Sequence, residues 1–205
     1  FNTASAVASK VQKKKKNKIV TEYPYLADHE RRVEDKIAEE ITLCVSQIRE
    51  ETPEKSIGVI TLNDHFQDKV IDALEDLGLF DSLADDECLF VRSLENAQGR
   101  EADVIIIAIE HDKRNIKGTL MKNISGFFNG GEATEQSGNN RLNVLFTRAR
   151  EKNIIFLAFD YNEIRDSERS LKRLYTYLEY AATGNMSCES EPKRTQDRAN
   201  ERAAL

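Results

Sequence analysis

Two segments of the sequence, about forty residues apart, place charged side chains next to short runs rich in Ile and Val. The first is Leu89–Glu110, which contains Gln98-Gly99-Arg100-Glu101, and the second is Gly138–Phe159, which contains Thr147-Arg148-Ala149-Arg150. Such apolar runs are typical of buried parallel strands whose ends carry functional groups. We therefore expect an arginine, a glutamate and further polar groups along one edge of one sheet, an arrangement that suits nucleoside-triphosphate chemistry.

The second segment predicts a helix over residues 139–150 that carries arginines beside its buried face. Its apolar residues recur at helical spacing: Leu142, Leu145, Phe146 and Ala149. Arg141 and Arg148 lie seven residues apart, so we expect both on one flank, with Arg150 on the opposite flank. Two guanidiniums beside a buried stripe are costly unless they meet anions. Periodicity alone favours salt bridges to carboxylates at the sheet end over contacts with a ligand.

Two shorter segments hold polar groups at predicted strand ends. Gly99 permits a tight turn or a close backbone approach, and Glu101 and Asp103 come just before an apolar strand. Taken alone, this segment also has the pattern of an ordinary polar turn. Thr61 and Asn63 end another apolar run, where a hydroxyl and an amide can bind phosphate or cap the next helix. Capping is the favoured interpretation of Asn63 in isolation.

Several other kinds of chemistry find no support in the sequence. His29, His65 and His111 lack the spacing of a metal or catalytic site, so we expect them at the surface. The three cysteines are too widely separated for a zinc site or a disulfide framework. No Gly-x-x-x-x-Gly-Lys-Ser/Thr occurs, so the chain lacks the phosphate loop of an independent NTPase. No membrane span or signal peptide is visible, which favours a cytoplasmic location.

The charge distribution is uneven. The net charge of −6 argues weakly against binding nucleic acid by charge alone, although a local site can still contact a few phosphates. Six lysines lie between Lys10 and Lys18. A solvated surface stretch is the favoured interpretation of this run, and a phosphate-backbone contact is the alternative. We expect residues 1–28 to form a flexible basic arm or linker, 29–183 the main domain and 184–205 a polar tail.

Strands and helices alternate in the pattern of an α/β fold with a mostly parallel sheet. Apolar periodicity predicts helices over 29–51, from Asn63 to Gly78, and from about Leu171 to Ala182. Strands are predicted over 56–62, 88–93, 103–109 and 153–159, with a long loop over 111–137. In such sheets the chemistry is expected beyond the carboxyl ends of the strands.

Three of these segments resemble motifs of the second RecA-like domain of superfamily-one helicases, in the branch of the nonsense-decay RNA helicases and the bacterial restriction- and defence-associated DNA helicases. Ile57–Leu74 resembles the fourth motif, Ser93–Ile109 the fifth, and Arg141–Phe156 the sixth, which is the most specific. Leu171–Ala181 resembles the helix that closes such domains. The likeness covers residues 56–182 and implies a RecA-like sheet flanked by helices, without a phosphate loop of its own.

The resemblance implies a nucleotide-binding role for five residues. Arg148 matches the arginine finger, which reaches the γ-phosphate of ATP bound by the first RecA-like domain. Glu101 matches the carboxylate that accepts a hydrogen bond from the ribose, and Gln98 and Gly99 shape its turn. Arg150 matches a position that supports the interdomain cleft, with a weaker nucleotide role.

The resemblance also implies a nucleic-acid track. Thr61 and Ser93 match hydroxyls that touch the nucleic-acid backbone. Asn63 is expected to line the same nucleic-acid track, although it stands where the family often has the tyrosine of Thr-Pro-Tyr and so cannot stack an aromatic ring on a base.

The implied protein is an ATP-dependent helicase or translocase, of which this chain is the C-terminal motor domain. ATP and Mg²⁺ would lie in a cleft against the first RecA-like domain of the same polypeptide, so we expect no metal site in this chain. Single-stranded nucleic acid is the expected partner, with DNA favoured over RNA and a bacterial source favoured. The isolated chain is then expected to lack ATPase activity. The alternatives are a degenerate RecA-like module that binds protein or nucleic acid without catalysis and, less favoured, a stand-alone nucleotide-binding enzyme.

Overall fold

The computed structural model describes residues 17–20, 29–81, 88–110, 124, 128 and 135–184. The helices are α1 (His29–Glu51), α2 (Asp64–Asp76), α4 (Glu135–Phe146) and α5 (Arg169–Thr183), with a short 3-10 helix η1 (Tyr161–Ile164). The strands are β1 (Asn17–Val20), β2 (Ile57–Thr61), β3 (Leu89–Ser93), β4 (Ala102–Ile109) and β5 (Ala149–Leu157). This alternation confirms the α/β fold that the sequence predicts.

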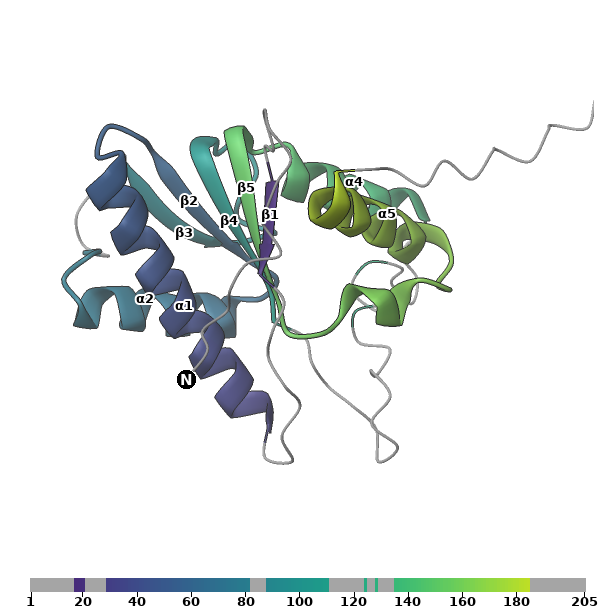
Figure 1. Ribbon diagram of the computed structural model, residues 1–205, viewed down its shortest axis with the longest axis horizontal. Helices are drawn as coiled ribbons and strands as arrows, with labels where there is room; N and C mark the ends of the chain where they lie inside the picture. Colours follow the sequence, from purple (N-terminus) through teal and green to yellow (C-terminus); the bar gives the residue numbers. More distant parts are fainter. Residues whose placement is uncertain are drawn as a thin grey trace, which may run out of the picture.

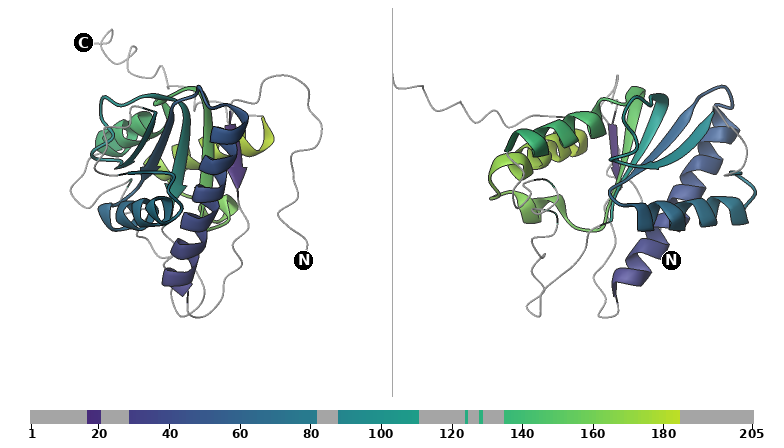
Figure 2. Two further views of the ribbon diagram at one scale, coloured as in Figure 1. Left: turned by 90° about the vertical axis from the view of Figure 1, so that its left-hand side faces the viewer. Right: turned by 180° about the vertical axis from the view of Figure 1, so that it is seen from behind.

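The five described strands form one parallel sheet in the order β1-β5-β4-β2-β3. Helices α1 and α2 cover one face of the sheet, and α4 and α5 cover the other (Figure 1). The view from behind shows the same three layers (Figure 2). Because the strands are parallel, their carboxyl ends share one edge and their amino ends the opposite edge. We call these the carboxyl edge and the amino edge.

Strand β4 shows why the sheet is buried on both faces. Its side chains alternate between the two core clusters, with Ile105, Ile107 and Ile109 on the α4/α5 face and Val104, Ile106 and Ala108 on the α1/α2 face. A near-continuous run of Val and Ile is what a parallel strand with two covered faces requires. The strand therefore holds its amino and carboxyl ends in fixed positions at opposite edges of the sheet.

The connection between β3 and β4 runs from the carboxyl edge back to the amino edge in the eight residues 94–101. Leu94 and Ala97 are buried in the cluster on the α4/α5 face, so this segment packs along the sheet. Gly99 has φ +79°, a left-handed conformation that favours glycine. It turns the chain directly before Glu101 and the start of β4.

The helix predicted over 139–150 is displaced in the structure. α4 ends at Phe146, and β5 begins at Ala149 rather than at residue 153. Strand pairing decides this boundary, because Ala149 pairs with Ala102 of β4 and the Ala102 amide donates to the Arg148 carbonyl at 3.2 Å. Arg148 therefore lies in the turn after the helix and Arg150 lies in β5. The predicted placement of the arginines on opposite helix flanks is wrong.

The other predicted elements lie close to the observed ones. Helix α1 matches 29–51, and the remaining strand predictions differ from the structure by a residue or two. Asn63 caps α2, because its side-chain oxygen accepts a hydrogen bond from the Phe66 amide at 2.8 Å. Most of the predicted loop over 111–137, most of the lysine run and residues 185–205 lie outside the described residues.

Candidate functional site

The candidate residues divide between the two edges of the sheet. Glu101 and Arg148 each directly precede a strand, and Arg150 is the second residue of β5, so all three lie at the amino edge. Thr61 and Ser93 are the last residues of β2 and β3 and pair with each other at the carboxyl edge. The expectation of one shared edge is therefore wrong. The chain has an amino-edge site and a carboxyl-edge site, separated by the length of the strands.

Glu101 and Arg148 are brought together by the pairing of β4 with β5. Ala102 pairs with Ala149, so the residues just before them in sequence lie side by side at the amino edge. Glu101 is exposed, as are Gln98 and the Gly99 backbone in the preceding turn. A carboxylate acceptor and a cation thus lie next to each other at a solvent-facing edge, in reach of a ligand that carries hydroxyls and phosphates.

Arg148 is half-buried and is held by hydrogen bonds to neutral groups. Its Nε donates to the Val144 carbonyl at 3.1 Å, and its Nη2 donates to Thr147 Oγ1 at 3.1 Å. Val144 lies in the last turn of α4, where carbonyls lack helical partners and a cation is favourable. In the described part of the chain no carboxylate pairs with Arg148, so its positive charge is not neutralised there.

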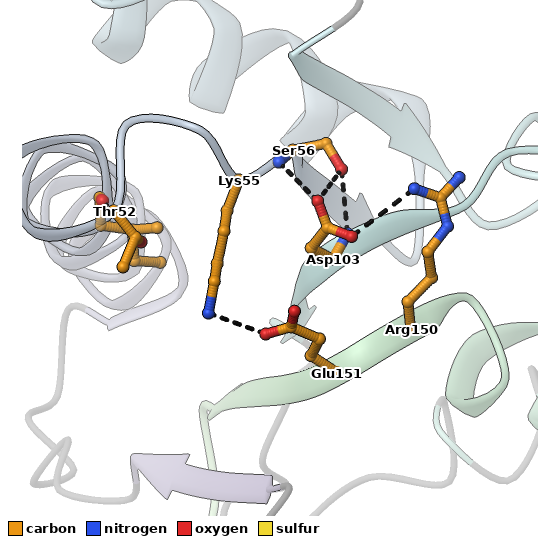
Figure 3. A network of polar contacts seen from close by, with 7 residues as sticks. Thr52, Lys55, Ser56, Asp103, Arg150 and Glu151 are labelled. Carbon is orange, nitrogen blue, oxygen red and sulfur yellow. Dashed lines mark hydrogen bonds and ion pairs between the residues drawn. The ribbon is translucent and has the colours of Figure 1, made fainter.

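Arg150 is paired with acidic residues on both sides of Ala102. Its Nη1 lies 3.5 Å from Asp103 Oδ1, and its Nε lies 3.9 Å from Glu101 Oε2. Asp103 is in turn fixed by Ser56, whose amide and hydroxyl donate to Asp103 Oδ2 at 2.9 and 2.7 Å. Figure 3 shows this chain of contacts running from the turn before β2 across β4 to β5. Hydrogen bonds from Ser56, aided by Arg150, lower the pKa of the Asp103 carboxyl, so it is ionised at neutral pH.

A second ion pair lies beside this network. Lys55 Nζ and Glu151 Oε2 are 2.7 Å apart, and both side chains are substantially exposed. Figure 3 shows the Lys55 side chain extending alongside Asp103 to reach Glu151 on β5. The pair ties the turn between α1 and β2 to β5 without contacting Arg150. An exposed pair of this kind adds little to stability.

The carboxyl edge presents a different picture, because its two predicted hydroxyls are buried. Thr61 is fully buried and its hydroxyl donates to the Asn63 carbonyl at 2.9 Å. Ser93 is 2% exposed, and its Oγ accepts a hydrogen bond from Asn96 Nδ2 at 3.0 Å. Asn96 is exposed and Asn63 is partly exposed. The polar groups that solvent reaches first at this edge are therefore the amides, with the hydroxyls beneath them.

Glu110 is a buried carboxylate that directly follows β4 at the carboxyl edge. It is 4% exposed, and it accepts hydrogen bonds from the Leu62 amide at 3.4 Å and from Asn63 Nδ2. Burial raises the pKa of its carboxyl to about 8, and the hydrogen bonds from backbone amides and from Asn63 offset only part of that effect. Glu110 thereby joins the end of β4 to the cap of α2.

Other predicted features are simpler. Arg141 lies 3.6 Å from Glu95, just beyond the end of β3, so the expected salt bridge to a sheet-end carboxylate is present for Arg141 but not, in the described part of the chain, for Arg148. His65 is exposed, as predicted, while the side chain of His29 and the whole of His111 lie outside the described part of the chain. Within the described ranges, no three His, Cys, Asp or Glu side chains are grouped so that they could hold a metal ion. No helix in those ranges is long and apolar enough to span a bilayer.

The sequence assigns no role to several residues of these networks, among them Asp103, Ser56 and Glu110. The sequence pattern places Asp103 in an ordinary polar turn and Ser56 at the start of a strand. Their link depends on β2 and β4 being neighbours, which no local pattern reveals. Glu110 is recognisable in the sequence, because a glutamate directly after six apolar residues indicates a charged group at the end of a buried strand.

The chain is similar in sequence to one protein family and to two mycoplasma proteins. The family described as AAA domain (AAA_12) matches residues 3–158. An uncharacterized ATP-dependent helicase of Mycoplasma pneumoniae, the MG140 homolog, is 35% identical over 106 residues, which is 50% of this chain and 8% of that protein. The uncharacterized ATP-dependent helicase MG140 of Mycoplasma genitalium is 35% identical over 97 residues, which is 46% of this chain and 8% of that protein.

The family match covers most of the chain, including β2 to β5 and both edges of the sheet. The similar helicases are much longer, since the matched region spans about one twelfth of each of them. The parallel sheet with helices on both faces is consistent with a RecA-like fold. The chain belongs to the AAA domain family AAA_12, and it is a helicase-like domain that resembles the C-terminal motor domain of superfamily-one helicases.

Proposed function

We propose that this chain is the second motor domain of an ATP-dependent nucleic-acid helicase or translocase and that its amino edge faces ATP held by another domain. The observation that carries the proposal is the position of Arg148 beside Glu101 on adjacent strand ends. Among the residues that the structure describes, no carboxylate pairs with Arg148, and Glu101 keeps an exposed carboxylate. The two mycoplasma relatives, each named as an ATP-dependent helicase, support ATP as the nucleotide.

The chemistry of each amino-edge residue suits a particular role in binding the nucleotide. Arg148 stabilises the negative charge that develops on the transferring phosphoryl group, an effect worth about 10³–10⁵ in rate for arginine fingers. Glu101 accepts a hydrogen bond from a ribose hydroxyl. Gln98 and Gly99 shape the turn that holds Glu101. A Cβ added at Gly99 would meet no atom within 4 Å, so the space beside this turn is open. Arg150 adds a second positive charge near the nucleotide.

ATP with Mg²⁺ supplies the reactive phosphoanhydride when it is bound in the cleft. In this proposal the first RecA-like domain of the same polypeptide provides the phosphate loop and the Mg²⁺-binding acid. The chain itself has no Gly-x-x-x-x-Gly-Lys-Ser/Thr sequence. The isolated chain therefore neither cradles the phosphates nor positions the attacking water, and it should have no ATPase activity.

The nucleic-acid track is proposed along the carboxyl edge. Thr61 and Ser93 lie at neighbouring strand ends, with the amides of Asn63 and Asn96 above them. In this proposal the Asn63 and Asn96 amides contact phosphate oxygens, and the buried hydroxyls of Thr61 and Ser93 support them through the Asn63 carbonyl and Asn96 Nδ2. Such contacts do not read bases, which suits a track that binds any single strand. DNA is favoured over RNA, and a bacterial cytoplasm is the favoured location.

The full-length parent protein tests the proposal. Its ATP hydrolysis, followed by phosphate release, should rise when single-stranded DNA is added and should rise less with single-stranded RNA. The 205-residue chain alone should give no turnover above a buffer control. Turnover by the isolated chain, or a parent protein that does not hydrolyse ATP with either strand present, would contradict the proposal.

A second candidate function is a non-catalytic module that binds protein or nucleic acid. One observation favours it, namely that the Arg148 guanidinium already closes the last turn of α4 through the Val144 carbonyl. Arg148 could then be a structural cap with no ligand. In that case replacing Arg148 would lower the stability of the chain and leave the ATP hydrolysis of the parent protein unchanged.

A further inference from the structure

A β-bulge lies at the amino edge between β4 and β5. Ala102 pairs with Ala149 and Val104 pairs with Lys152, so Asp103 alone stands opposite both Arg150 and Glu151. Bulges of this kind re-aim side chains and are common next to functional sites. Here the two opposing residues reach different partners, since Arg150 pairs with Asp103 and Glu151 pairs with Lys55 (Figure 3).

Asp103 is held more firmly than its partners at this edge. Ser56 donates two hydrogen bonds to Asp103 Oδ2, and Ser56 Oγ in turn accepts from the Asp103 amide at 3.0 Å. This reciprocal contact fixes the carboxylate on the backbone of β2 and β4. Its other oxygen, Oδ1, is directed to Arg150. A fixed anion next to a side chain that is 58% exposed restricts where that cation can lie.

Arg150 lies within ion-pairing distance of two carboxylates. It lies 3.5 Å from Asp103 Oδ1 and 3.9 Å from Glu101 Oε2. Without the charge of Asp103, Arg150 would keep Glu101 as its anionic partner, and the distance between the Arg150 guanidinium and the Glu101 carboxylate would shorten. The lone pairs of Glu101 would then be engaged by a guanidinium and less available to a ligand hydroxyl.

We propose that Asp103, anchored by Ser56, is a positioning residue for nucleotide binding: it holds Arg150 at the bulge and so keeps the Glu101 carboxylate available to the ribose. This inference rests on the proposed function, because it concerns the same amino-edge site. Asp103 touches no nucleotide itself and acts through Arg150. The two ion pairs at the bulge thus have different consequences, since the Lys55–Glu151 pair only joins β5 to the turn between α1 and β2.

The test compares ATP hydrolysis by the full-length parent protein and its variants. Asp103→Asn should raise the KM for ATP about two- to fivefold with little change in kcat, the range expected for one exposed charge pair. Ser56→Ala, which keeps the Asp103 charge but loosens its anchor, should raise KM by less. Glu151→Gln is the matched control, since it removes a neighbouring carboxylate and leaves Arg150 untouched, and its KM should equal that of the wild type.

A double-mutant cycle separates positioning from a general effect on folding. In an Arg150→Gln background, Asp103→Asn should give no further rise in KM, because the residue that it positions is gone. Urea unfolding of the 205-residue chain checks that each variant folds, and if Asp103→Asn does not fold, Ser56→Ala decides.

Two results would overturn the inference: a KM for Asp103→Asn no higher than that for Glu151→Gln, or a rise in KM on Asp103→Asn that is the same in the Arg150→Gln background as in the wild type. If Asp103→Asn does not fold, a KM for Ser56→Ala equal to that of the wild type would overturn it instead. Each of these leaves the ATP hydrolysis of the wild-type parent intact. A wild-type parent that hydrolyses no ATP with single strands present would instead refute the proposed function, and the inference would fall with it.

Discussion

Glu110 should make the stability of this chain depend on pH in the direction opposite to that of most carboxylates. Its pKa rises from the ordinary value of 4.5 to about 8 in the folded chain, chiefly because the carboxyl is buried. A raised folded-state pKa means that the folded chain binds the proton more tightly than the unfolded chain does. The contribution of Glu110 to stability is therefore fully present below pH 4.5 and is lost as the pH rises to about 8.

The size of the effect follows from the two pKa values. At pH 5 the unfolded carboxyl is mostly ionised and the folded one is protonated, which costs about 1 kcal/mol of unfolding free energy. At pH 8 the cost reaches about 4 kcal/mol. Because Glu110 is only 4% exposed, solvent screens little of this effect. The free energy of unfolding should thus lose about 3 kcal/mol between these pH values through Glu110 alone.

Glu110→Gln isolates this contribution from that of the other titrating groups. The Leu62 amide and Asn63 Nδ2 donate to different oxygens of the carboxyl, and glutamine puts an NH2 group in place of one of them, so the variant should be less stable than the wild type at pH 5 by about 1–2 kcal/mol. At pH 8 it should be the more stable of the two. Glu110→Leu should show the same change with pH, displaced by a constant amount, since it too removes the ionisable group.

The assay is urea unfolding of the 205-residue chain, followed by circular dichroism at half-unit steps from pH 5 to pH 8.5. The quantity to compare is the difference in unfolding free energy between each variant and the wild type at each pH. Parallel curves for wild type and Glu110→Gln would refute the reasoning, because they would show that Glu110 titrates alike in the folded and unfolded chains.

Further predictions concern packing and capping. Gly58→Ala should destabilise the chain by about 1–3 kcal/mol in urea unfolding, because the new Cβ would lie 2.3 Å from Phe90 Cζ and 2.6 Å from Ile105 Cδ1. Adding Phe90→Leu to the Gly58→Ala variant should restore part of that loss. An unchanged urea midpoint for Gly58→Ala would contradict this prediction, because it would show that the Phe90 ring moves aside at no cost. Asn63→Ala should lower the free energy of unfolding by about 1–2 kcal/mol, since it removes the cap of α2 and the hydrogen bond to Glu110. Hydrogen exchange should show the loss of protection first in the opening turn of α2. Equal protection of that turn in the variant and the wild type would count against the cap.

The sequence allowed the layers of the fold to be predicted, because each buried strand and amphipathic helix carries its own local pattern. Strand β4 is an example, because Val104–Ile109 is an unbroken apolar run that is rich in β-branched residues and short for a buried helix. The end of α4 could not be predicted in the same way. Ala149 continues the helical apolar spacing, yet it joins β5 because β4 offers a partner across the sheet.

Sequence motifs single out the residues of the candidate site but not their arrangement. The segment Gln98–Glu101 and Arg148 were identified from motifs, whereas their location at the amino edge depends on the crossover 94–101 that returns along the sheet. The link from Ser56 to Asp103 joins residues 47 positions apart, and only the strand order brings them together. Contacts made across strands are invisible to local periodicity.

The central claim is that Arg148 acts on a nucleotide held by another domain, and one measurement tests it most directly. ATP turnover by the full-length parent should be compared for wild type, Arg148→Ala and Arg173→Ala, an exposed arginine of α5 that serves as the control. Nucleotide binding should be measured in parallel with a fluorescent ATP analogue. The account predicts that Arg148→Ala lowers kcat by at least about 10³ while nucleotide affinity changes little, and that Arg173→Ala changes neither. Turnover by Arg148→Ala that matches the Arg173→Ala control would contradict the account.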